Sequence, residues 1–111
     1  MHEKIEVYMY SEALVLLTPN RRYVSVKVRD GYWERTDLAE AFKSIAQSHK
    51  EIHIAENHTP YVWLDQFDTK KGLLLVSLQT NSLVSKKVVT LKMSDDGKNL
   101  SVVAVSDKGK K

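Results

Sequence analysis

The sequence predicts an α+β fold, in which a single α-helix covers part of a largely antiparallel, curved β-sheet of about seven or eight strands. One stretch, at about residues 36–49, has helical periodicity, and segments with the alternation typical of strands lie on both sides of it. Turn-forming residues separate these segments at hairpin spacing. The resulting order, β-β-β-β-α-β-β-β-β, favours antiparallel neighbours, in one strongly curved sheet or in two pieces.

Length and composition suit one small globular domain. The 111 residues are 42% hydrophobic and 28% charged, which is enough apolar surface to bury a core without metals or disulfides. We expect residues 1–106 to form a single α+β domain and residues 107–111 to be a disordered, basic tail. The chain has no cysteine, no visible signal peptide and no apolar run long enough to cross a bilayer, so we expect a cytoplasmic protein that does not enter a membrane.

The first predicted strand covers residues 4–10, whose side chains alternate in polarity. We assign the aliphatic side chains to the core and the tyrosines to the opposite, outward face. The core set is Ile5, Val7 and Met9, and the outward set is Glu6, Tyr8 and Tyr10. A continuous apolar run at residues 13–18 then predicts a strand buried on both faces.

A second alternating pair of strands precedes the helix. At residues 22–29 the valines at 24, 26 and 28 form the core face, and the side chains between them point outward. Asp30-Gly31 predicts a type I′ hairpin turn, because both central residues of that turn need positive φ. Residues 32–35 are the short return strand.

The predicted helix has both a start signal and an apolar stripe. Thr36 or Asp37 can cap its N-terminus, and Glu40 stands three residues after Asp37, as in a capping box. Leu38, Phe42 and Ile45 share one face, so the helix should lie on a sheet rather than be buried all round.

The second half of the chain predicts further strands. Residues 51–55 and 61–67 alternate, and residues 73–79 are apolar enough for a central strand. Residues 84–93 and 99–106 flank Ser94–Lys98, whose composition predicts a hairpin turn.

The outward face of the first strands is the candidate binding surface, because it combines aromatic rings with cations. Rings can stack on bases while Lys and Arg neutralise phosphates, as binding of single-stranded nucleic acid requires. The same residue types are enriched at protein interfaces. The candidate residues are Tyr8, Tyr10, Tyr23, Lys27, Arg29 and Trp33.

Two partner classes therefore remain open, nucleic acid and protein. The net charge is +3, but residues 107–111 contain three lysines and one aspartate, a net charge of +2, so residues 1–106 carry only +1. This balance weakens the electrostatic case for nucleic acid. The alternative is a protein–protein interaction or inhibitor module that uses the same face or dimerises through strand edges to give a homodimer.

Catalytic signatures are absent from the sequence, so we expect a non-enzymatic protein without metal or cofactor. The histidines at positions 2, 49, 53 and 58 do not form a recognised ligand pattern. The acid pairs Asp65/Asp68 and Asp95/Asp96 are interpreted as turn or strand-end carboxylates. Nothing supplies a nucleophile motif or a phosphate-binding glycine loop.

Overall fold

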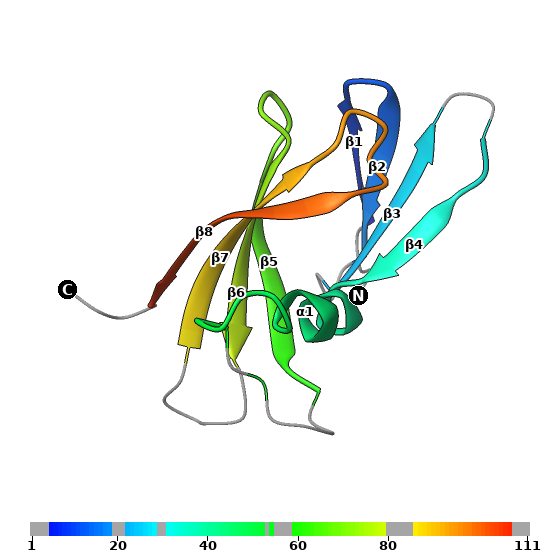
Figure 1. Cartoon of the computed structure of the whole chain (residues 1–111). Helices are drawn as coiled ribbons and strands as arrows, with labels where there is room; N and C mark the ends of the chain where they lie inside the picture. The colour runs from blue at the N-terminus through cyan, green and yellow to red at the C-terminus, as the bar shows by residue number, and fades with distance from the viewer. Residues whose placement is uncertain are drawn as a thin grey trace.

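A computed structural model describes residues 5–18, 22–28, 31–52, 54, 59–79 and 86–107. Its eight strands form two four-stranded antiparallel sheets (Figure 1). The N-terminal sheet contains β1 (Glu6–Tyr10), β2 (Ala13–Leu17), β3 (Tyr23–Val28) and β4 (Glu34–Asp37). The helix α1 (Leu38–Ile45) follows, and the C-terminal sheet contains β5 (Tyr61–Asp68), β6 (Leu73–Gln79), β7 (Lys86–Met93) and β8 (Leu100–Asp107).

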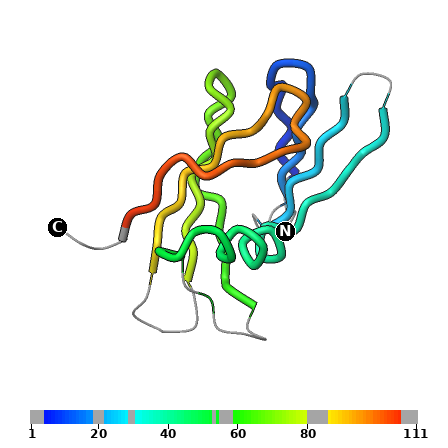
Figure 2. The backbone as a smooth tube through the Cα atoms, in the orientation of Figure 1, coloured from blue at the N-terminus to red at the C-terminus, as the bar shows by residue number. Residues whose placement is uncertain are grey.

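The predicted fold class and element order are confirmed. Four strands, one helix and four strands follow each other along the described residues, and every strand pairing is antiparallel. The strands form two separate, unclosed sheets, which was one of the two expected arrangements. In each sheet the spatial order of the strands repeats their order in the sequence, as the smooth backbone trace in Figure 2 shows.

The first hairpin has the shortest connection. Tyr10 pairs with Ala13, which leaves a two-residue turn at Ser11-Glu12. Ser11 has φ of 53° and is the only non-glycine residue with positive φ in the described part of the chain. A type II′ hairpin turn needs positive φ at this position, so the twist of the flanking strands accounts for the unusual backbone conformation.

The two sheets share one core. Inward-facing side chains from both sheets pack with Leu38, Ala39 and Phe42 of α1. Tyr10 is the main link between the sheets, because its ring lies edge-on to Phe67 of β5 at a centroid distance of 6.3 Å. Its hydroxyl donates to the Met93 carbonyl of β7 at 3.3 Å and accepts from Lys92 Nζ at 2.7 Å.

The turn between β7 and β8 makes a second connection between the sheets. The Glu12 N–H donates to the Asp95 carbonyl at 3.3 Å, and Lys98 forms an ion pair with Glu34 at 3.4 Å. Gly97, with φ of 77°, lies so close to Val26 and Ala13 that an added Cβ would be 2.9 Å from a Val26 methyl group. Glycine at this position therefore lets the turn rest directly on the N-terminal sheet.

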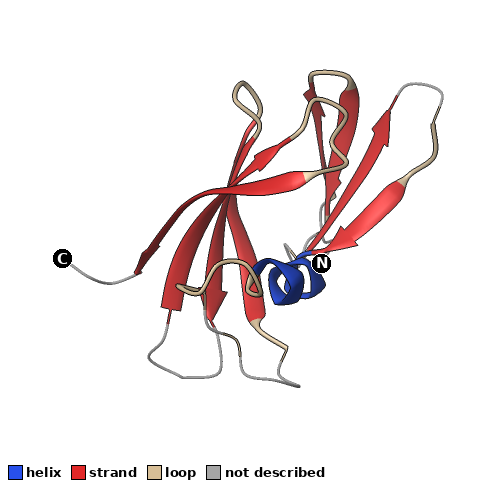
Figure 3. Cartoon of the chain, viewed as in Figure 1, coloured by secondary structure: helices blue, strands red, loops and turns tan. Residues whose placement is uncertain are grey.

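Figure 3 shows the helix beside the sheets, where α1 contacts β4 and β5. Of the two predicted candidates, Thr36 and Asp37, it is Asp37 that caps the helix, and it accepts a hydrogen bond from the Ala39 N–H at 2.9 Å. The helix is shorter than the predicted 36–49, because Thr36 belongs to β4 and turns replace the helix after Ile45. In the described residues no helix is both long and apolar enough to cross a membrane.

Asp37 also fixes Arg22. The guanidinium donates to both carboxylate oxygens at 2.8 Å, and this pairing, more than the N–H of Ala39, lowers the pKa of Asp37 below its usual 3.8. A lowered pKa in the folded state means that the pair stabilises the fold above about pH 4 and is lost as pH falls through the lowered pKa.

We expect Asp37→Asn to lower the free energy of unfolding at pH 7 by about 1 kcal/mol, because Asn can still cap the helix but cannot pair with Arg22 as an anion. Urea unfolding of both proteins between pH 7 and pH 2 checks this. The difference should shrink toward zero at the acid end. A difference that is unchanged down to pH 2 would contradict an ionic origin.

In one strand the inward and outward faces are the reverse of those predicted. In β1, Val7 and Met9 are exposed, whereas Tyr10 is buried and Tyr8 is half-buried against Phe67. The assignment of the aliphatic side chains to the core was therefore wrong. The inner face of β1 meets the aromatic ring of Phe67 and the glycine at position 72, a space that suits flat tyrosine rings better than branched side chains.

Three further predictions are corrected. The run at residues 13–18 is not buried on both faces, because Leu14 is exposed on the uncovered side of the sheet. None of the described residues of the predicted strand 51–55, which are 51, 52 and 54, belongs to a strand. Gly31 lacks positive φ and donates to the Val28 carbonyl at 2.8 Å, so a type I′ turn does not form there. The pairing of Val26 with Glu34 leaves a wider connection instead.

The strands of the C-terminal sheet follow the sequence closely. In β5, Val62 and Leu64 are buried, and β6 lies between β5 and β7 as a central strand should. β7 and β8 form the predicted hairpin around Ser94–Lys98. Asp107, the first residue of the predicted tail, is the last residue of β8 and pairs with Lys87 of β7. The rest of that tail lies outside the described residues.

Candidate functional site

The six predicted site residues do not form one face. Tyr8 and Tyr10 point to the interior between the sheets, where their rings lie edge-on to Phe67 at 5.6 Å and 6.3 Å. Tyr23 and Lys27 are half-buried in β3, on the opposite side of the N-terminal sheet from the core valines Val24 and Val26. Trp33 is exposed in the connection before β4, and Arg29 lies outside the described residues.

Tyr23 already has cationic neighbours. The Arg35 guanidinium lies 4.7 Å from the ring centroid of Tyr23, and that of Arg22 lies 5.4 Å away. Arg35 and Asp37 of β4 oppose Ser25 and Tyr23 of β3, so this group occupies the outer face of the N-terminal sheet on the β4 side. A guanidinium over a tyrosine ring is a favourable cation–π contact.

The rest of this outer face is aliphatic. Val7 pairs with Leu16, and Met9 pairs with Leu14, so side chains from two adjacent strands form a continuous surface. Val7 is 57% exposed and Met9 is 74% exposed. Ile5, just before β1, is also exposed. We call this surface the apolar patch, and its members are Ile5, Val7, Met9, Leu14 and Leu16.

A shallow groove continues the apolar patch beyond its Met9 end. Its volume is about 670 Å³, and its lining includes Met9, Leu14 and Lys27 together with the turn residues Ser11 and Glu12. The strand register places Lys27 beside Leu14, which in turn is beside Met9. Among the described residues that line this groove, Lys27 is the one cation and Glu12 the one carboxylate.

Prediction from sequence missed the apolar patch. Ile5, Val7 and Met9 were assigned to the core because aliphatic side chains are buried more often than tyrosines. The period of two in the sequence separates the two sets correctly but does not state which set faces inward. Aromatic side chains often pack against one another in a core. The presence of Phe67 in a later strand was therefore the sequence feature that favoured Tyr8 and Tyr10 as the inward set.

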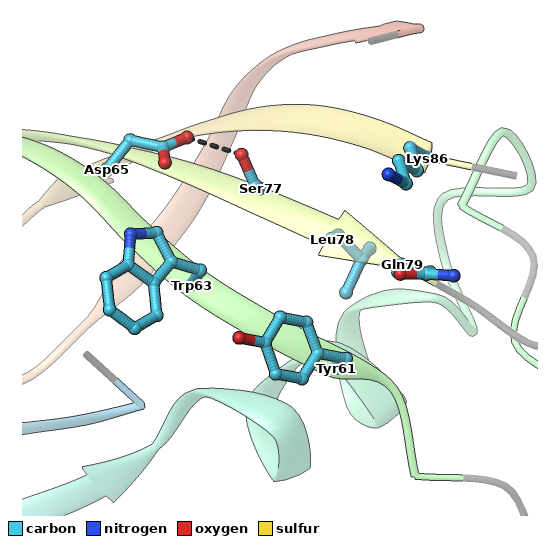
Figure 4. Close-up of a pocket in the computed structure, with 7 residues that line it drawn as sticks. All are labelled: Tyr61, Trp63, Asp65, Ser77, Leu78, Gln79 and Lys86. Carbon is cyan, nitrogen blue, oxygen red and sulfur yellow. Dashed lines mark hydrogen bonds between the residues drawn. The ribbon is translucent and has the colours of Figure 1, made fainter. Parts of the chain in front are cut away.

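A second concave surface lies on the outer face of the C-terminal sheet. Figure 4 shows Tyr61 and Trp63 projecting side by side from β5, with Gln79 and Lys86 across the sheet. The cavity has a volume of about 310 Å³. Ser77 donates a hydrogen bond to Asp65 at its other side. We call this surface the ring groove, and its lining includes Tyr61, Trp63, Asp65, Ser77, Gln79 and Lys86.

One member of each predicted acid pair, Asp68 and Asp96, serves a turn, whereas Asp65 lies within β5. Asp68 Oδ1 accepts from the N–H groups of Lys70 and Lys71. Asp96 Oδ1 accepts from the Ser94 hydroxyl and the Lys98 N–H, and the Ser94 bond lowers the pKa of Asp96 most. Across the described ranges, no three His, Asp or Glu side chains are grouped as metal ligands.

Comparison with protein-family models, with curated proteins and with solved structures finds no match to this chain.

Proposed function

We propose that this protein is a non-enzymatic interaction module whose binding surface is the apolar patch, and that the partner is a second copy of the chain. The observation that carries the proposal is the exposure of Val7 and Met9, next to Leu14, on the outer face of the four-stranded N-terminal sheet. Contiguous exposed apolar side chains on a small protein are typical of interaction sites.

The extent of the patch favours a partner that packs on the face of the sheet. Among the described residues β1 pairs only with β2, so its other edge could accept a strand. However, Leu14 and Leu16 belong to β2, which already pairs with β1 and β3. Covering them requires a surface laid over the sheet, as in the packing of two sheets face to face.

The charge pattern supports a second copy as the partner. No member of the apolar patch is charged, so two copies related by a two-fold axis can bring their patches together without burying an ion. The described lining of the adjoining groove carries one residue of each sign, Glu12 and Lys27, which allows opposite charges to meet at the rim.

Substitution of Val7 by lysine should convert the dimer to a monomer. Val7→Lys places a charge in the centre of the patch, and an unpaired buried charge should weaken self-association at least about 30-fold. Light scattering across a concentration series measures the mass. Val103→Lys is the matched control, because Val103 is 58% exposed on β8, close to the 57% of Val7 on β1.

Leu14→Lys separates the two ways of dimerising. Face-to-face packing predicts that it dissociates the dimer as Val7→Lys does, whereas pairing through the edge of β1 predicts a much smaller effect. A wild-type protein that is monomeric at every concentration, or a dimer that Val7→Lys leaves intact, would contradict the proposal.

Nucleic-acid binding through the outer face of the N-terminal sheet is the second hypothesis. The observation in its favour is that Lys27, Arg35 and Tyr23 do share this face. Binding of this kind should weaken steeply as salt concentration rises, and Lys27→Ala should reduce the slope. Filter binding of a single-stranded oligonucleotide at several salt concentrations distinguishes it from self-association.

A further inference from the structure

The ring groove, unlike the apolar patch, combines two neighbouring aromatic rings with polar side chains. Tyr61 is 64% exposed and Trp63 is 39% exposed, and both side chains project from the same face of β5. Side chains two residues apart on a strand are separated by about 7 Å, so the rings form a platform longer than one ring. Tyr61 opposes Gln79 and Trp63 opposes Ser77, which sets polar side chains beside each ring.

A β-bulge adds a further polar group to this platform. The register between β5 and β6 shifts between Leu64 and Gln66, and Asp65 is the extra residue. Asp65 and Gln66 are consequently both exposed, although neighbouring residues of a regular strand face opposite sides. Ser77 donates to Asp65 Oδ2 and holds the carboxylate at the end of the groove near Trp63. Bulges commonly redirect a side chain in this way at binding sites.

The charges in the groove are balanced. Asp65 supplies one negative charge and Lys86 one positive charge, at opposite ends of the lining in Figure 4. Nucleic acid needs several cations along its phosphates, and a carboxylate beside the tryptophan opposes that binding. The groove therefore suits a neutral ligand with both apolar and hydrogen-bonding surface.

We infer that the ring groove binds a neutral oligosaccharide. The face of an aromatic ring carries partial negative charge and attracts the polarised C–H groups on the flat face of a sugar ring. The sugar hydroxyls lie around the rim of that face, where Asp65, Gln79 and Lys86 supply acceptors and donors. Because the platform is longer than one ring, a chain of sugars contacts both Tyr61 and Trp63, whereas a monosaccharide contacts one of them. The volume of about 310 Å³ lies at the small end of the range for ligand pockets.

The chain offers a direct optical test. It contains two tryptophans, so Trp33→Phe leaves Trp63 as the only one. Trp33 is exposed in the connection between β3 and β4 of the N-terminal sheet, and its replacement should leave the fold intact. The probes are four neutral tetrasaccharides: β-linked glucose, α-linked glucose, β-linked N-acetylglucosamine and β-linked mannose. A 12-nucleotide oligothymidylate serves as the anionic comparison.

We expect at least one tetrasaccharide to change the Trp63 emission with saturation, and the corresponding monosaccharide to bind more weakly. In the same background, Tyr61→Ala should weaken binding about 2- to 12-fold, as the loss of one stacking contact implies. Tyr32→Ala is the matched control, because Tyr32 is also exposed but lies by the N-terminal sheet, and it should leave the affinity unchanged. Circular dichroism confirms that each variant is folded.

Several outcomes would overturn the inference. The first is no response of Trp63 to any of the four tetrasaccharides. The second is equal weakening by Tyr61→Ala and Tyr32→Ala. The third is preferential binding of oligothymidylate, strengthened by Asp65→Asn, which would identify the groove as a nucleic-acid site. Self-association through the apolar patch is measured separately, so its failure would not affect this test.

Discussion

Gly72→Ala should lower the free energy of unfolding by about 2–6 kcal/mol. Gly72 has φ of 69°, a backbone conformation that costs a residue with a side chain about 1–3 kcal/mol. An added Cβ would also overlap the Tyr10 ring, with Cε1 only 2.7 Å away. Gly72 cannot move aside easily, because its N–H donates to the Asp68 carbonyl and its carbonyl accepts from the Met93 N–H, both at 2.8 Å. Overpacking of this kind typically costs another 1–3 kcal/mol.

Urea denaturation of matched variants isolates the clash with Tyr10. Gly31→Ala is the control, because Gly31 lacks positive φ and its nearest obstacle is the Val28 carbonyl oxygen at 3.1 Å. It should cost less than about 1 kcal/mol. Tyr10→Leu removes the ring, so the loss from Gly72→Ala should be smaller in the Tyr10→Leu background than in the wild type. Equal losses in both backgrounds would show that Tyr10 does not constrain this glycine.

Phe42→Ala should be the most destabilising change in the helix, with a cost of about 3–5 kcal/mol. Phe42 is fully buried, and it anchors α1 where the helix contacts β4 and β5. Truncation to alanine leaves a cavity that the two sheets cannot close without breaking their own ladders. A domain of this size has a total stability of about 5–15 kcal/mol, so much of the protein could be unfolded at 37 °C.

The control for Phe42→Ala lies two residues further along the same helix. Ser44 is exposed, so Ser44→Ala should change the free energy of unfolding by no more than about 0.5 kcal/mol. Thermal and urea unfolding followed by far-ultraviolet circular dichroism measure both variants. A loss of less than about 1 kcal/mol for Phe42→Ala would mean that α1 is peripheral to the core.

The sequence was most informative where one face of an element is clearly more apolar than the other. In β5 the aliphatic Val62 and Leu64 alternate with Tyr61 and Asp65, and the aliphatic pair is buried while the other two residues are exposed. The N-cap at Asp37 could be predicted because it depends on its own side chain and a backbone N–H two residues away. Local chemistry of this kind does not need the rest of the fold.

The sequence was least informative where the answer depends on contacts with distant residues. Both faces of β1 are substantially apolar, so exchanging them changes little in any local measure. The choice is made by Phe67 and Gly72, which lie in the other half of the chain and receive the tyrosine rings. The apolar patch follows from that choice, and the candidate surface is therefore largely different from the predicted one.

The agreement between the order of strands in space and in sequence has a consequence for folding kinetics. Each sheet closes only short loops as it forms, whereas the bond from Lys92 to Tyr10 joins residues 82 positions apart. Loop-closure entropy therefore favours a folding order in which each sheet forms early as a meander and the two sheets dock against each other late. Substitutions that disturb the packing of Tyr10 against the C-terminal sheet, such as Gly72→Ala, should therefore mainly accelerate unfolding and leave the folding rate nearly unchanged.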